Sequence, residues 1–357
     1  MSFSKARFKA LHFELTNKCN LRCRHCYNVN YLTSSAPELS LTQVKKIIDL
    51  AQDIGCADIG FSGGEPFARK DFIEILEYAK KYPIHVLSNG VLIDEAVVEK
   101  LNAIPELILE IRISLDGLDS HEKIRGISYT DVLKHICLLL ENDYVVTVNT
   151  MITEDNLTEL NDMFTLFSEI GVDRWRLDFI FSSGNASKNG KFYNEPDKIL
   201  AALEKLIARY IREQPAFEFD VNKLFRSSLL SNSVTLSYSL DSKPCEYQGS
   251  LTVRPDGQVS FCPSLELTHG NILTTPLSQI TSDDKWVEFS NITVVDLDSR
   301  CHNCVYMPYC GGGCRADAYY ETGSLYGIAP FTCELMKLYV EKVVPMIMAY
   351  RNTSENV

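Results

Sequence analysis

The chain has 357 residues and 45% hydrophobic content, enough to bury a barrel-sized core and a second, smaller domain. Its net charge of -12 gives it no broad cationic surface, so we discount nucleic acid and anionic lipid membranes as partners. No stretch is apolar for long enough to span a bilayer, and the first residues lack the apolar run of a signal peptide. We therefore expect a cytoplasmic protein.

Between residues 11 and 214, short β-rich runs alternate with segments of helical period, which is typical of parallel βα units. Ser40 is expected to cap the first long helix and Gly55 to end it. We predict strands over 11–17, 57–64, 84–90, 109–117, 144–152 and 174–181, and helices over 41–55, 71–81, 94–104, 130–142, 157–171 and 196–214. Six units indicate an α/β fold, a partial (β/α)6 TIM-like barrel with its active site at the carboxyl ends of the strands.

The domain boundaries follow from changes in this pattern. We predict the barrel over 1–214, a connector over 215–244, a cysteine-rich domain over 245–335 and a helix over 336–357 that Pro345 interrupts. The polar residues 182–190 are expected to form a loop that covers the barrel mouth as a lid.

The twelve cysteines fall into two dense groups. Residues 19–26 hold three and residues 245–333 hold seven, while Cys56 and Cys137 are interpreted as core residues. In a reducing compartment, such clustering indicates metal binding rather than disulfide bonds.

The first group, Cys19, Cys23 and Cys26, directly follows the first predicted strand. Thiolates at this spacing can hold one corner of an iron-sulfur cubane and leave one iron without a protein ligand. A structural zinc site is the alternative, but it needs a fourth ligand that His25 is poorly placed to supply. The motif, followed by Tyr27, resembles the radical SAM superfamily. The resemblance implies a 4Fe-4S cluster, S-adenosylmethionine (SAM) on the open iron, a 5′-deoxyadenosyl radical, and His25 and Tyr27 near SAM.

The second predicted strand ends in Ser-Gly-Gly-Glu-Pro, which matches the GGE element of the same superfamily. Glycine lets the backbone approach a ligand closely, although a plain turn is the alternative. The resemblance implies that Gly63, Gly64 and Glu65 bind the methionyl amino group of SAM. It also implies three further SAM-binding residues, each of which also suits a turn or helix cap: Ser114, Arg125 and Asn149.

The second group begins at Cys245, ends at Cys333 and includes the segment Gly-Gly-Gly-Cys-Arg. Its spacing resembles the SPASM domain of radical SAM peptide and protein maturases, whereas a zinc ribbon would use only four of the seven thiols. The resemblance implies two auxiliary 4Fe-4S clusters. One would be bound by Cys301, Cys304, Cys310 and Cys333, and the other by Cys245, Cys262 and Cys314 with an unassigned fourth ligand.

These motifs predict a radical SAM oxidoreductase that abstracts hydrogen from a ribosomally made peptide and produces an oxidative crosslink or an epimerised residue. An anaerobic sulfatase maturase fits less well, because that family has an eighth auxiliary cysteine and an acidic residue where Pro263 stands. A tetrapyrrole-modifying enzyme of a haem pathway stays open, since the segment around Cys314 is similar there. An iron-sulfur electron carrier or a zinc-stabilised scaffold is the non-enzyme alternative, and it would not need the GGE element.

The predicted partners are a peptide or protein substrate and an external low-potential electron donor of the flavodoxin or ferredoxin type. Cys19 lies too near the start for a leader-binding domain ahead of the barrel, so leader binding would need a separate protein or another surface. Arg176 and Asp178, on the sixth predicted strand, are candidates for accepting the substrate proton, with a buried ion pair as the alternative.

Overall fold

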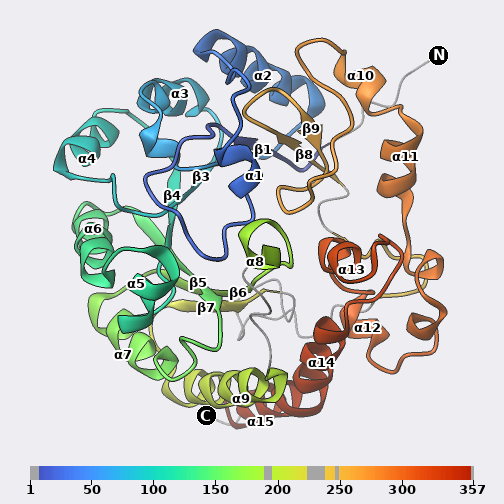
Figure 1. Ribbon diagram of the computed structural model, residues 1–357. Coiled ribbons are helices and arrows are strands. Elements are labelled where there is room, and N and C mark those ends of the chain that lie inside the picture. The colour runs from blue at the N-terminus through green and yellow to red at the C-terminus, as the bar shows by residue number, and fades with distance from the viewer. Residues whose placement is uncertain (1–7, 189–194, 223–237, 246–248, 355–357) are drawn as a thin grey trace. The chain divides into compact units, whose positions relative to one another are not determined.

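A computed structural model of the chain describes residues 8–188, 195–222, 238–245 and 249–354 (Figure 1). The chain forms two compact units, each described by itself below. The first contains the described residues within 1–114, 130–146 and 246–291, and the second those within 115–129, 147–245 and 292–357. None of the helices in the described ranges has the length and apolar character needed to cross a membrane.

The first unit is built on a sheet with the strand order β4-β3-β2-β1-β8-β9. Its strands are β1 (Ala10–Glu14), β2 (Asp58–Ser62), β3 (Ile84–Ser88), β4 (Leu109–Ser114), β8 (Ser250–Val253) and β9 (Val259–Ser260). β1 pairs in parallel with both β2 and β8, whereas β9 runs antiparallel to β8. Strands from the predicted cysteine-rich region therefore extend the sheet of the predicted barrel, a pairing that no local sequence signal indicated.

Helices follow these strands as predicted. They are α1 (Val29–Leu32), α2 (Leu41–Ile54), α3 (Phe72–Ala79), α4 (Glu95–Asn102), α6 (Tyr129–Glu141), α10 (Leu277–Ile280) and α11 (Asp284–Asn291), with the 3-10 turn η1 (Pro66–Ala68). The predicted ends of α2 are confirmed, because Ser40 forms a capping box with Gln43 and Gly55 closes the helix at φ 75°. The buried residues of α2 recur at helical spacing, so one face packs into the core: Val44, Ile47, Ile48 and Ala51.

The second unit contains three parallel strands, β5 (Val145–Ile152), β6 (Arg174–Phe179) and β7 (Glu218–Val221), of which β5 begins in the first unit. Its helices are α5 (Asp119–Arg125), α7 (Leu160–Ile170), α8 (Gly184–Lys188), α9 (Pro196–Glu213), α12 (Met307–Cys310), α13 (Arg315–Thr322), α14 (Pro330–Leu338) and α15 (Val344–Ser354). The shorter turns are η3 (Val294–Asp296), η4 (Ser299–Cys301) and the π-helical η5 (Tyr339–Val343). The predicted α/β class with a parallel sheet is confirmed.

One face of β5–β7 is apolar and is covered by α7 and α9 (Figure 1). Trp175 is fully buried there, with its ring centroid 5.1 Å from that of Phe167 on α7 and 5.4 Å from that of Phe219 on β7. Side chains alternate along a strand, so the residues between these point to the opposite face. On that face, Asn149, Arg176 and Asp220 stand in register on neighbouring strands and are only half-buried. The second unit therefore presents a polar sheet face opposite its core.

The structure adds detail where the sequence pattern was weak. Strand β7 lies within the predicted connector 215–244, of which residues 223–237 fall outside the described ranges. Part of the predicted lid over 182–190 forms the short helix α8, and residues 189 and 190 are likewise outside those ranges. The predicted interruption at Pro345 is confirmed: the π-helical η5 precedes α15, because proline donates no backbone hydrogen bond to the preceding turn.

A buried ion pair joins the ends of two strands in the first unit. Glu14 is the last residue of β1, Arg254 follows β8, and their side chains are fully buried and bonded to each other. Burial opposes the charge on Arg254, but the Glu14 carboxylate and neighbouring tyrosine oxygens outweigh it and raise its pKa. The guanidinium also lies 4.8 Å from the centroid of the Tyr31 ring. Both charges are thus compensated inside the protein.

We predict that Arg254→Met destabilises the first unit by about 3–5 kcal/mol, because it leaves the Glu14 carboxylate buried without a cation. The chain has two tryptophans, and Trp286 belongs to the first unit. Urea unfolding followed by Trp286 fluorescence in a Trp175→Phe background would measure the loss. Lys45→Met, which removes the more exposed pair with Glu74, is the control and should change stability by less than about 1 kcal/mol. Equal effects of the two variants would contradict the prediction.

Candidate functional site

The segment that carries Cys19, Cys23 and Cys26 follows β1 and is held by the end of β2. The backbone N–H of Gly64 donates to the Thr16 carbonyl at 2.7 Å, and that of Glu65 to the Lys18 carbonyl at 2.8 Å. All three thiols are partly exposed. The segment therefore has a fixed path while its sulfur atoms stay accessible to a metal cluster.

Gly63 and Gly64 are required by the packing of this cysteine segment. A Cβ on Gly64 would lie 2.2 Å from the Lys18 carbonyl oxygen, and one on Gly63 would lie 2.8 Å from the Thr16 oxygen. Gly63 also has φ +130°, a conformation that other residues rarely adopt. The sequence suggested that these glycines make room for a ligand, whereas in the structure the closest atoms belong to the cysteine segment.

Glu65 is fully buried and connects three segments of the first unit. Its carboxylate accepts hydrogen bonds from the Ser88 hydroxyl and the Asn89 N–H, both at 2.8 Å. The Asn89 side chain in turn donates to the Asn20 side chain at 2.8 Å. Burial raises the pKa of the Cys19 thiol, and the Glu65 charge adds to this although the Leu21 N–H opposes it. A thiolate here is therefore stable only beside a cation, which suits iron ligation.

Residues just after Cys26 contact the Glu14–Arg254 pair. The Tyr27 hydroxyl donates to Glu14 at 3.3 Å and the Asn28 amide at 3.0 Å, and burial, followed by the Glu14 charge, raises the pKa of Tyr27. His25 is buried, with 9% of its surface exposed. Arg254 donates to the Leu265 carbonyl at 2.7 Å, three residues beyond Cys262. One ion pair thus supports both cysteine-bearing segments of the first unit.

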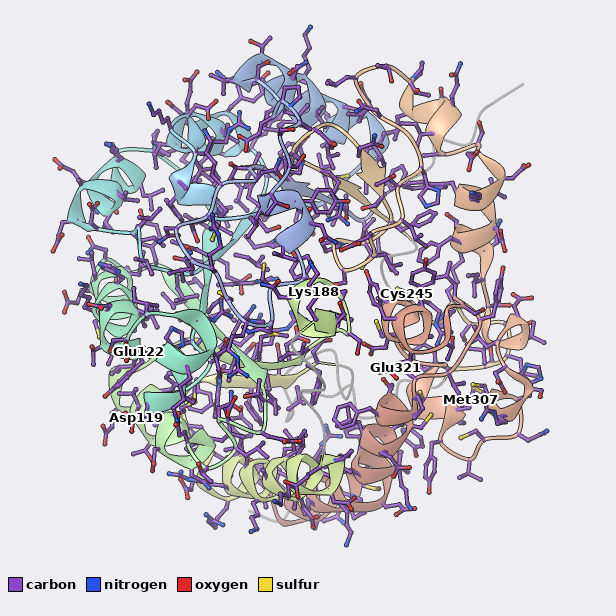
Figure 2. The ribbon with its side chains drawn as sticks, in the orientation of Figure 1. Asp119, Glu122, Lys188, Cys245, Met307 and Glu321 are labelled. Carbon is purple, nitrogen blue, oxygen red and sulfur yellow. The ribbon has the colours of Figure 1, made fainter. Side chains whose placement is uncertain are left out.

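Arg125 belongs to the second unit and pairs with a buried carboxylate. Its Nε donates to Asp116, whose other oxygen accepts from the Met151 N–H at 2.8 Å. This joins α5 to β5, while Asp119 and Glu122 on the same helix are exposed (Figure 2). Arg125 therefore contacts Asp116, and a role toward the SAM carboxylate stays a prediction.

Ser114 and Asn149 are both half-buried residues of strands. Ser114 is the last residue of β4 in the first unit, whereas Asn149 lies on β5 in the second. The Oδ1 atom of Asn149 is buried and accepts no hydrogen bond from any described residue. It is therefore available to a hydrogen-bond donor of a ligand.

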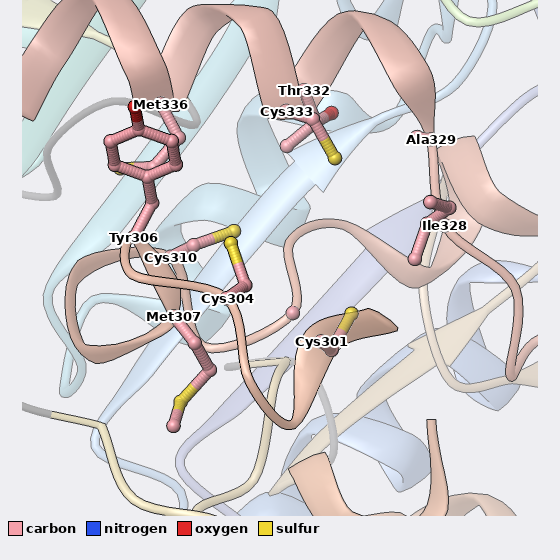
Figure 3. Close-up of a pocket in the computed structure, with 11 residues that line it drawn as sticks. Cys301, Cys304, Tyr306, Met307, Cys310, Ile328, Ala329, Thr332, Cys333 and Met336 are labelled. Carbon is pink, nitrogen blue, oxygen red and sulfur yellow. The ribbon is translucent and has the colours of Figure 1, made fainter. Parts of the chain in front are cut away.

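Four of the seven C-terminal cysteines line one cavity of the second unit. Cys301, Cys304, Cys310 and Cys333 point toward a common space beside α14 (Figure 3). Within the described ranges, no three His, Cys, Asp or Glu side chains lie close enough to bind a single ion. Four thiols around one cavity are the donor set of a 4Fe-4S cluster. Burial raises the pKa of the Cys310 thiol to about 11 and that of Cys301 and Cys333 less. These thiolates too need a bound cation.

The other cysteines are distributed over both units. Cys245 and Cys314 belong to the second unit and Cys262 to the first. Cys56 is buried, as expected, but Cys137 on α6 is only half-buried. This difference arises because Cys137 stands beside the inward-facing Ile136 of the helix and points away from its buried stripe.

The predicted alternative of an ion pair between Arg176 and Asp178 is wrong. Asp178 accepts from the Asn222 side chain at 2.8 Å, and the buried Nε of Arg176 has no hydrogen-bond partner among the described residues. Both side chains lie on the polar face of β5–β7. They are thus held apart from each other and remain open to a substrate.

Sequence reasoning missed Glu14, Arg254 and Arg315. The signal for Glu14 was a charged residue in the apolar run Leu-His-Phe-Glu-Leu, and for Arg254 an arginine at the end of Leu-Thr-Val-Arg. Charges in strands that are otherwise buried indicate a partner elsewhere in the chain. The partner itself is a long-range contact that spacing does not reveal.

Two protein-family models match the chain, one over the region of the first cysteine group and one over part of the second. The family model described as "Radical SAM superfamily" matches residues 13–167, and the SPASM model, described as "Iron-sulfur cluster-binding domain", matches residues 245–305. The chain is 28% identical over 345 residues to an AdoMet-dependent heme synthase of Nitratidesulfovibrio vulgaris, covering 88% of this chain and 89% of that protein. It is 26% identical over 358 residues to a PqqA peptide cyclase of Gluconobacter oxydans, covering 95% of each.

Solved structures share the fold. SuiB of Streptococcus suis bound to its precursor peptide SuiA has a TM-score of 0.73 at 16% identity and covers 92% of this chain and 76% of its own. The structure of anSMEcpe with bound AdoMet and a Kp18Cys peptide has a TM-score of 0.77 at 19% identity. The match covers 98% of this chain and 99% of that protein. The solved structures show a shared fold. The two family matches show that the chain is a radical SAM enzyme that carries an iron-sulfur SPASM domain.

Proposed function

We propose that this enzyme is a maturase that modifies a ribosomally made peptide by an oxidative crosslink or an epimerisation. Cys19, Cys23 and Cys26 would hold the cluster that binds SAM, and cluster and SAM together supply a 5′-deoxyadenosyl radical that abstracts a substrate hydrogen. His25, Tyr27, Gly63, Gly64, Glu65, Ser114, Arg125 and Asn149 are proposed to surround SAM, as the family resemblance implies.

The observation that carries the proposal is the polar face of β5–β7. Asn149 on β5 and Arg176 on β6 are cross-strand neighbours, and each has a buried polar atom without a hydrogen-bond partner among the described residues. One is an acceptor and the other a donor. Unsatisfied buried polar atoms are costly, so their persistence in adjacent positions indicates a ligand that completes them. Asn149 is proposed to face SAM, so Arg176 beside it is the donor left for the substrate, and a peptide carbonyl is an acceptor of this kind.

The charges on this face favour a peptide over a tetrapyrrole. Arg174 is engaged with Glu218 and lies 3.7 Å from Asp220, which leaves Arg176 as the cation not paired with a carboxylate in the described part of β5–β7. Asp178 adds a further negative charge on the same side. A tetrapyrrole with several carboxylates would meet more negative than positive charge here, whereas a neutral backbone segment would not.

Asp178 is the proposed acceptor of the substrate proton. It lies near the carboxyl end of β6, and the Asn222 amide fixes its side chain at 2.8 Å. Crosslinking removes two hydrogens from the peptide, so one further electron must leave the substrate after hydrogen abstraction. The clusters bound by the C-terminal cysteines are proposed to accept it. An external donor of the flavodoxin or ferredoxin type would reduce the first cluster. A leader sequence would be bound by a separate protein or by another surface of this chain.

Relatives support this proposal and one competitor. The PqqA peptide cyclase and AlbA, a protein of subtilosin biosynthesis in Bacillus subtilis, favour a peptide substrate. AdoMet-dependent heme synthases, at 26–28% identity, favour a haem-pathway reaction instead, which is the second candidate.

A direct experiment separates the two candidates. The reduced, reconstituted enzyme would be incubated with SAM and either the short peptide encoded beside its gene or iron-coproporphyrin III, and both would be analysed by mass spectrometry. We expect a peptide lighter by two hydrogens, or one that incorporates solvent deuterium if the reaction is an epimerisation. A modified tetrapyrrole with an unmodified peptide would establish the second candidate.

Arg176→Met should lower the rate of peptide modification about ten- to a hundredfold, because a hydrogen bond to a charged group contributes about 1.5–3 kcal/mol. The melting temperature should not fall, since the Nε atom of the Arg176 side chain makes no hydrogen bond to the described residues. Arg174→Met is the matched control: that guanidinium is already paired with Glu218, so the rate should stay near that of the native enzyme. Equal losses in both variants would contradict a substrate role for Arg176.

Anaerobic reconstitution should yield about twelve irons per chain, since the ligand sets suggest three 4Fe-4S clusters. Cys310→Ala removes one proposed thiolate ligand from the cavity in Figure 3, so about four of these irons should be lost. The other two clusters should stay loaded. Cys137→Ala is the matched control and should change nothing. Iron analysis and Mössbauer spectroscopy would measure both, and a native content of about four irons would contradict the auxiliary clusters.

A further inference from the structure

Arg315 is a buried cation bonded to backbone carbonyls. It directly follows Cys314, begins α13 and has 1% of its surface exposed. Its guanidinium donates to the carbonyls of Leu325 at 2.8 Å, Gly327 at 2.9 Å and Gly313 at 3.3 Å, and to that of Gly312. These bonds hold its position but carry no formal negative charge.

No carboxylate of the described residues lies within ion-pair distance of this guanidinium, whose polar contacts are the four carbonyls. The buried Arg254 differs, because it is bonded to Glu14. A buried charge without an opposite charge is strongly destabilising in a protein interior. Arg315 therefore needs an anion other than a carboxylate.

The surrounding cysteines can supply that anion. Arg315 directly follows Cys314, and its guanidinium lies within electrostatic range of Cys301, Cys245 and Cys310. Gly312, which accepts from Arg315, also lines the cavity of Cys301 and Cys310. Cys245, whose charge also acts on Arg315, is labelled in Figure 2. The arginine thus stands among cysteines from both proposed auxiliary ligand sets.

We propose that Arg315 is a positioning residue that raises the reduction potential of the auxiliary iron-sulfur clusters, because its fixed positive charge stabilises the electron that a cluster gains. The inference rests on the cluster assignment in the proposed function and is independent of the substrate. Nearby charge and hydrogen bonds are among the factors that set the potential of such clusters. A higher potential would make them better one-electron acceptors.

The test compares Arg315→Gln and Arg315→Lys by EPR-monitored redox titration. Cys23→Ala in the full reconstituted chain removes the first cluster, so the signal reports the auxiliary clusters alone. Arg315→Gln should lower the one-electron reduction equilibrium constant at least tenfold, about 59 mV for one electron. Arg315→Lys retains the charge and should stay within a few-fold of the native value.

Arg300→Gln is the matched control. Arg300 also precedes a cluster cysteine, Cys301, but it is 71% exposed and paired with Asp298 at 2.7 Å. Its charge is screened by water and by that carboxylate, so its removal should shift the equilibrium less than Arg315→Gln does. Equal shifts in the two glutamine variants would overturn the proposal.

Iron content distinguishes charge from backbone bonding. If Arg315→Gln loses auxiliary iron while Arg315→Lys keeps it and titrates within a few-fold of the native value, the positive charge is what the clusters need, and the proposal holds. If both lose iron equally, or if all variants titrate at the native potential, the arginine acts only through its bonds to the carbonyls, and the proposal fails. Because no substrate is added, these outcomes are separate from those that test the peptide substrate.

Discussion

The buried pair of Glu14 and Arg254 is the interaction on which the first unit depends. It fixes the end of β1 against the end of β8, so the segment that carries Cys19, Cys23 and Cys26 starts from a defined point. Glu14 also accepts from Tyr27 and Asn28, directly after the third cysteine. Arg254 reaches the carbonyls beyond Cys262. A single ion pair therefore sets the geometry of two cysteine segments that are far apart in the sequence.

Buried charged groups are stabilised in different ways in different parts of the structure. Glu65 and Asp116 are buried carboxylates that obtain their hydrogen bonds from neighbouring backbone and side chains. The cysteine thiols obtain less support: burial raises the pKa of Cys19, Cys301, Cys310 and Cys333, although backbone N–H groups partly oppose this at Cys19 and Cys310. In the proposed assignment, iron would be the cation that stabilises their thiolates, so metal binding and folding of these segments would be coupled. Arg315 is the reverse case, a buried cation that needs anionic clusters.

The sequence predicted the elements that depend on local pattern. The six strands, the capping of α2 by Ser40 and Gly55, the break at Pro345 and the two cysteine groups all follow from periodicity, caps and spacing. The pairing of β8 with β1, the strand β7 and the bond between Glu14 and Arg254 did not. Each joins residues distant in the chain, and nothing within one segment encodes its partner. Gly63 and Gly64 show the same limit, since the atoms that exclude a side chain belong to another segment.

The central claim is that Cys19, Cys23 and Cys26 hold the cluster at which SAM is cleaved. The most direct measurement is release of 5′-deoxyadenosine by the reduced, reconstituted enzyme with SAM, compared between the native chain, Cys23→Ala and Cys310→Ala. We expect release of 5′-deoxyadenosine by the native chain and by Cys310→Ala, which keeps the first cluster. Cys23→Ala should give only background release. Equal release with and without Cys23 would contradict it.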